Sequence, residues 1–209
     1  MPESNYEKTK RRVQAEFSSH SPDAIVKKFS LQEDAAGIYV PFLGRTYRIH
    51  RQTGQTVWSE DGFQTCFPAG FEETLSLFDL LIDSAPDCAP SFSYCKINSL
   101  PSLSRTASAP GSDCVCTETA QRIQSAPAAF CAACARLGGR PFGIGDLSYR
   151  IPVFRELCAV AEFWFADEEF APVLQILWDS AVLRYVRYET VWYIQSHLLR
   201  RLREEMDCL

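Results

Sequence analysis

Three consecutive acidic residues interrupt the apolar segment FWFADEEFAPVLQILWDS. Asp167, Glu168 and Glu169 could act as metal ligands, because carboxylate oxygens are preferred by Ca²⁺ and Mg²⁺. If residues 163–166 and 173–178 are antiparallel strands, the acids lie at the tip of the connecting loop. Solvent alone can satisfy charges there. A solvated turn is therefore the default interpretation; a metal or substrate site and structural hydrogen bonding are the alternatives.

Asp179 is separate from these acids. It lies about six residues along the second strand, which places it roughly 20 Å from the tip at ~3.3 Å per residue. A simple hairpin therefore prevents Asp179 and Asp167 from sharing one metal ion. Asp179 is instead expected to cap a short helix over residues 181–185.

Nine cysteines provide a second possible chemistry. Cys114 and Cys116 are two residues apart, and Cys131 and Cys134 are three apart on one face of an expected helix. Two thiol pairs could hold Zn²⁺ or an iron–sulfur cluster. The alanines around Cys131 and Cys134 favour packed or free thiols as the default, and a redox dithiol is a further alternative.

The three histidines lie outside any catalytic motif. The chain has no H-E-x-x-H, no G-x-S-x-G and no phosphate-binding glycine loop. His197 is expected on the flank of a long helix rather than as a ligand. No nucleophile–base pair can be named, so the sequence leaves open whether the protein is an enzyme.

These residues are positioned by two kinds of periodicity. Spacing of apolar residues predicts helices near both termini, the last with Val191, Ile194, Leu198 and Leu202 as its stripe. Period-two segments predict strands, and Trp164 and Trp178 are expected to belong to the core sheet. The expected strands cover residues 37–44, 45–51, 56–60, 148–154, 158–165 and 173–178. The expected helices cover residues 3–19, 22–29, 71–84, 118–124, 127–137 and 188–206.

The fold class that follows is α+β, with a mixed, largely antiparallel sheet, packed helices and a long C-terminal helix. We expect an N-terminal helical segment (1–34) and one α+β domain (35–209). A Pro/Ser-rich stretch at 85–111 interrupts this domain as a surface loop or a lid.

Composition limits the class of protein. The 209 residues include 21 Lys and Arg and 26 Asp and Glu, giving a net charge of −5, so no nucleic-acid partner is expected. No run of about 18 apolar residues occurs, so no membrane partner is expected. The charged N-terminal sequence lacks an apolar signal core, which predicts a cytoplasmic protein.

The second half of the chain resembles a known family. Gly138-Gly139, Gly145-Asp146, FWFADEEFAP and ILWDS occur in this order, and VPFLGRTYRI precedes TGQTVW. This pattern, over roughly residues 35–202, is similar to the domain-of-unknown-function family 3786 of anaerobic bacteria and archaea. Ala166 stands where the family usually has a glycine before the acids.

The resemblance implies a compact cytoplasmic α+β domain of unestablished activity. Asp146 is a binding candidate if the fold brings it beside the acidic loop. The leading functional hypothesis is a binding or accessory protein for a metal or an anaerobic cofactor. The alternatives are a metal-dependent enzyme that uses the acidic loop and a structural interaction module; the cofactor, whether divalent cation, zinc or iron–sulfur cluster, is left open.

Overall fold

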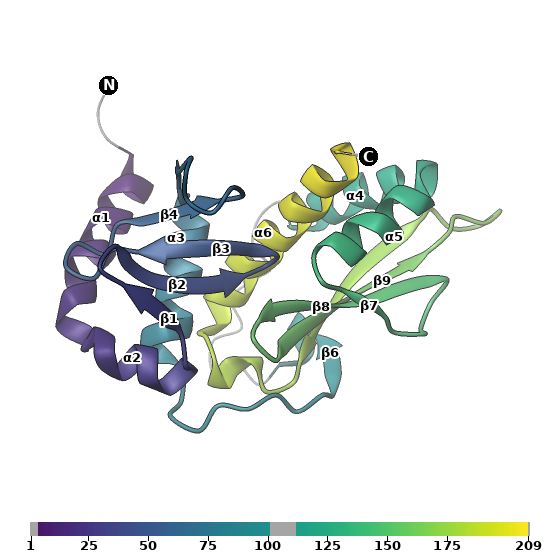
Figure 1. Ribbon diagram of the computed structural model, residues 1–209. Coiled ribbons are helices and arrows are strands. Elements are labelled where there is room, and N and C mark those ends of the chain that lie inside the picture. Colours follow the sequence, from purple (N-terminus) through teal and green to yellow (C-terminus); the bar gives the residue numbers. More distant parts are fainter. Residues whose placement is uncertain (1–3, 101–111, 209) are drawn as a thin grey trace.

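The strands of this chain form two antiparallel sheets in a computed structural model that describes residues 4–100 and 112–208 (Figure 1). Across the first sheet the order is β1 (Gln32–Asp34), β2 (Gly37–Phe42), β3 (Arg45–Ile49), β4 (Thr56–Ser59) and β5 (Phe67–Pro68). Across the second it is β6 (Tyr94–Lys96), β10 (Val173–Asp179), β9 (Leu157–Trp164), β8 (Leu147–Phe154) and β7 (Arg140–Pro141).

The helices pack around and between these sheets. They are α1 (Asn5–Phe17), α2 (Pro22–Phe29), α3 (Phe71–Phe78), α4 (Ser112–Ser125), α5 (Pro127–Arg136) and α6 (Tyr188–Asp207). Helix α6 contacts α3, α4 and α5, and Figure 1 shows it running between the first sheet and helices α4 and α5. The predicted α+β class and long C-terminal helix are therefore confirmed.

The turn between β2 and β3 joins the two sheets. Leu43 and Gly44 both have positive φ angles, and a Cβ atom on Gly44 would lie 2.8 Å from Leu137 Cδ2. Glycine is required at this position because the turn is both left-handed and tightly packed. The Leu43 N–H donates to the Val153 carbonyl at 3.0 Å, which fixes the turn to β8.

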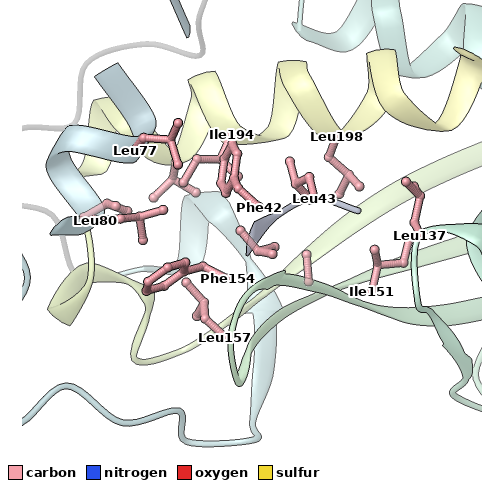
Figure 2. Close-up of a cluster of buried hydrophobic side chains, with 14 of the residues drawn as sticks. Phe42, Leu43, Leu77, Leu80, Leu137, Ile151, Phe154, Leu157, Ile194 and Leu198 are labelled. Carbon is pink, nitrogen blue, oxygen red and sulfur yellow. The ribbon is translucent and has the colours of Figure 1, made fainter. Parts of the chain in front are cut away.

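One apolar core spans both sheets. Figure 2 shows Phe42 and Leu43 beside Ile151 and Phe154, with side chains from α3 and α6 closing over them. The expected stripe of α6 (Val191, Ile194, Leu198 and Leu202) is fully buried in this core. The helix thus holds the two sheets in a fixed relation.

Two local predictions are wrong. Helix α4 begins at Ser112 rather than at Glu118. His197 is fully buried instead of lying on the flank of its helix. Trp164 and Trp178 both belong to the second sheet, as predicted; Trp178 is fully buried, whereas Trp164 projects from the face opposite the helices and is half-buried.

Candidate functional site

The acidic residues 167–169 lie in the exposed loop between β9 and β10. One oxygen of the Asp167 carboxylate accepts the backbone N–H groups of Glu169 at 2.9 Å and Phe170 at 2.7 Å. These hydrogen bonds lower the Asp167 pKa, since they favour the charged form. The carboxylate therefore closes its own turn, and Glu168 and Glu169 extend into solvent at the tip.

Asp146 lies at the base of the same loop, so the structure brings it near the acids. Its carboxylate accepts the Phe165 N–H at 2.7 Å, and its own N–H donates to the Phe163 carbonyl at 3.0 Å. Both contacts anchor the strand end at which the loop begins. This geometry gives Asp146 a role in positioning backbone.

Asp179 lies at the opposite end of β10 and is fully buried. Its carboxylate accepts backbone N–H groups from Ser91, Phe92 and Ala181 at 2.8–3.0 Å, as well as the Ser91 hydroxyl at 2.7 Å. The expected separation from Asp167 is confirmed. The start of the Pro/Ser-rich stretch is thereby tied to the strand end remote from the acids, and residues 101–111 lie outside the described part of the chain.

The cysteine pairs are placed on helices α4 and α5. Cys134 is fully buried, and burial raises its pKa. A hydrogen bond with Cys131 is the main cause that raises the Tyr149 pKa to about 12. Cys116 is half-buried, and the Cys114 side chain lies outside the described residues. Among described side chains, no group of three or more His, Cys, Asp or Glu residues is arranged to hold a metal ion; the four-thiolate site stays a prediction.

A groove lies between the first sheet and the C-terminal half of α6. Its volume is about 880 Å³. One wall is aromatic: Trp58 and Phe67, paired across β4 and β5, stack with ring centroids 4.7 Å apart. The Arg45 guanidinium lies 3.7 Å from the Trp58 ring centroid, a cation–π contact. Ligand sites favour such junctions between structural units.

The two cations deepest in this groove are already neutralised. Arg45 pairs with Glu60 at 3.0 Å and with Glu204 at 3.2 Å. Arg201 pairs with Glu204 at 2.7 Å and with Glu205 at 2.6 Å. Their side chains are only 9% and 3% exposed, whereas the Glu60 and Asp207 side chains are 64% and 60% exposed. A ligand that enters the groove therefore meets mainly carboxylates.

A buried hydrogen-bond chain lies beside the groove. Because Arg200 can only donate, its contact with His197 Nδ1 at 2.8 Å leaves the imidazole proton on Nε2. Nε2 then donates to the Tyr47 hydroxyl at 3.1 Å, and this hydroxyl donates to the Glu73 carboxylate at 3.0 Å. The chain connects α6, β3 and α3 through groups that are all satisfied.

The electrostatics of this chain keep its central groups neutral. Burial, together with the charges of Arg200, Arg201 and Arg45, lowers the His197 pKa to about 2. Burial and the neighbouring Glu73 carboxylate raise the Tyr47 pKa. Neither group can exchange a proton near neutral pH, so the chain acts as a structural connection under the groove.

The sequence analysis missed these groove and network residues. Period two places Arg45, Tyr47 and Trp58 on one face of the meander, and the spacing of Arg201, Glu204 and Glu205 predicts contacts along one helix. Each of these two patterns can be recognised in the sequence by itself. Nothing in the sequence indicates that the last helix lies across that face.

The fold and groove define an α+β protein with a charged groove between its first sheet and its last helix. A family model described as "Domain of unknown function (DUF3786)" matches residues 21–201. The chain belongs to this family, which confirms the resemblance seen in the sequence. No curated protein and no solved structure matches the chain. In residues 4–100 and 112–208, no helix has the length and apolar character of a membrane span.

Proposed function

We propose that this chain is a binding or accessory protein and that its ligand occupies the groove between β3–β5 and α6. The observation that carries the proposal is the charge distribution of the groove. The guanidinium groups of Arg45 and Arg201 are buried and paired, the half-exposed Arg136 pairs with Glu205 at 3.5 Å, and the other accessible charges are carboxylates. The exposed Phe67 ring adds an apolar surface beside them.

This chemistry favours a cationic ligand with an apolar stem, such as the lysine or arginine side chain of a partner protein. An ammonium or guanidinium group can pair with Glu60 or Asp207, while its methylene stem packs on Phe67. An anionic ligand would meet repulsion from the same carboxylates. The volume of the groove accommodates more than one side chain.

The other hypotheses from the sequence stay predictions. Binding of a metal or an anaerobic cofactor, a metal-dependent reaction at the acidic loop, and a purely structural role each require a direct measurement. We also propose a cytoplasmic location, as the resemblance to the family implies.

Titration with trilysine, followed by calorimetry and tryptophan fluorescence, tests the groove. We expect saturable binding of trilysine and none of triglutamate. The double variant Glu60→Gln/Asp207→Asn should bind about three- to fivefold more weakly, the value of exposed ion pairs. Phe67→Ala should lower the affinity for trilysine about two- to fivefold.

Matched controls lie outside the groove. Asp87→Asn removes an exposed, paired carboxylate, and Phe92→Ala removes a phenyl ring that is also exposed. Both variants should bind trilysine like the wild type. Equal binding of trilysine and triglutamate, or unchanged affinity in the groove variants, would contradict the proposal.

A further inference from the structure

A row of basic residues crosses the second sheet on the face remote from the helices. The strand register aligns Arg140, Arg150, Val160, Leu177 and Lys96 across all five strands. Residues in register share a face of the sheet. Ile151 and Trp178, the next residues along β8 and β10, point into the core, so this row lies on the outer face.

The cations of this row have no close ion pair. Arg140, Arg150 and Lys96 form no ion pair with any described residue, although Arg150 contacts the Tyr94 hydroxyl and the charge of Lys96 reaches the Glu162 carboxyl group. Elsewhere in the described chain, arginines of both the groove and the α6 N-terminus are paired with carboxylates. In a chain of net charge −5, three unpaired cations on one face form a local positive surface.

One uncharged donor and one aromatic ring lie beside the row. The Tyr94 hydroxyl is buried and has no hydrogen bond of ordinary geometry in the described structure, but the Arg150 side chain contacts it and opposes the burial that raises the Tyr94 pKa. The Phe142 ring lies against Tyr94, with centroids 5.3 Å apart. A buried hydroxyl without a hydrogen bond of ordinary geometry costs free energy, which a ligand could recover.

Val160, at the centre of the row, is fully buried although it lies outside the helix-facing core. Side chains of the outer face must therefore close over it. Arg150 and Tyr94, on β8 and β6, converge across this position, and the pKa of Tyr94 responds to the charge of Arg150. The guanidinium of Arg150 and the phenol of Tyr94 thus place their hydrogen-bond donors close together above Val160.

The carboxyl group of Glu162 lies in the neighbouring row, opposite Ser148 and Gln175. The residue is 8% exposed and has no hydrogen bond or ion pair with any described residue. Burial raises its pKa, an effect that the charge of Lys96 partly offsets.

We propose that this outer face, centred on Arg150 and Tyr94, binds the oxyanion of a small organic ligand, a phosphate ester or a carboxylate. Arg150 supplies a planar pair of donors, the geometry that suits both groups. The Tyr94 hydroxyl supplies a third donor, and Lys96 and Arg140 add positive charge at either side. The half-exposed ring of Phe142 can contact the apolar body of the ligand.

Three probes at equal ionic strength test this site by calorimetry: inorganic phosphate, phenyl phosphate and benzoate. We expect saturable binding of at least one organic anion, more tightly than inorganic phosphate because of the contact with Phe142. Preference for phenyl phosphate would identify a phosphate ester as the ligand, and preference for benzoate a carboxylate. A single-stranded oligonucleotide is the fourth probe. If it binds more tightly than the small anions and this binding depends on Arg150, the oxyanion site is supported and the bound oxyanion is identified as a nucleic-acid phosphate.

Two variants and one control decide the outcome. Arg150→Met should weaken binding about tenfold or more, as expected for a charge-assisted hydrogen bond. Tyr94→Phe should weaken it about fivefold and should not impair folding, because the hydroxyl that it removes has no hydrogen bond of ordinary geometry in the fold. Arg12→Met, which changes an exposed arginine on α1, should bind like the wild type. Absence of saturable binding by all probes, or wild-type affinity in both Arg150→Met and Tyr94→Phe, would overturn the proposal.

Discussion

Acidification should destabilise this protein through His197. The residue is fully buried and its pKa is lowered from 6.5 to about 2. Below pH 6.5 the unfolded chain takes up a proton at this histidine, whereas the folded chain does not. The stability linked to the neutral imidazole is therefore present above about pH 6.5 and is lost progressively as the pH falls toward 2.

The magnitude follows from the linkage. Each pH unit in that window changes the free energy of unfolding by about 1.4 kcal/mol. Between pH 7.5 and pH 5, His197 should therefore cost the wild type about 2 kcal/mol. Urea unfolding at several pH values, followed by circular dichroism, measures this loss.

Comparison of variants isolates the histidine. Gln cannot take up a proton, so His197→Gln should start less stable and should lose about 2 kcal/mol less than the wild type over the same interval. His20→Gln, at an exposed position, should follow the wild type. Parallel losses in the wild type and His197→Gln would refute a neutral, buried imidazole. Should His197→Gln fail to fold, proton uptake on unfolding of the wild type at pH 5 gives the same information.

Three further expectations concern the second half of the chain. Trp178→Ala should lower the free energy of unfolding by about 3–5 kcal/mol, because it opens a cavity and leaves the Gln195 amide without its indole donor; a wild-type melting curve would contradict the packing of β10. Substitution of residues 167–169 by their amides should leave the urea midpoint nearly unchanged, and a calcium- or magnesium-dependent rise in melting temperature that only the wild type shows would reveal a cation site. The double variant Cys131→Ser/Cys134→Ser should retain the metal content of the wild type in elemental analysis, and loss of about one equivalent of zinc or iron would establish a thiolate site.

Local patterns in this sequence predicted its elements well. The alternation in 37–51 and 56–60 became the first sheet, and 148–178 became three paired strands with Leu174, Ile176 and Trp178 buried together. Period two predicts such strands because one face must be buried. The same pattern does not show how far a residue at a strand end is covered, so the half-buried state of Trp164 could not be predicted.

The candidate sites were harder to predict, because they depend on contacts between distant segments. The acids at 167–169 are conspicuous in the sequence, and in the structure Asp167 caps the turn that carries them. Tyr47, Glu73 and His197 are inconspicuous in sequence, yet they meet because β3, α3 and α6 pack on one another. That a cation such as Arg150 lacks an ion-pair partner can be recognised only when its neighbours on the four other strands are known.

Helix α6 explains how core packing creates the groove. Its apolar stripe fixes its rotation, since Ile194, Leu198 and Leu202 must all face the core that spans the two sheets. At this rotation, His197 reaches Tyr47, and the Arg201 side chain lies at the Leu43 carbonyl. The following turn then carries its carboxylates to the Arg45–Trp58 wall. The groove therefore cannot change shape without a rotation of α6, and such a rotation would expose the stripe. A ligand in this groove meets a surface that is already organised, so binding needs little ordering of the protein.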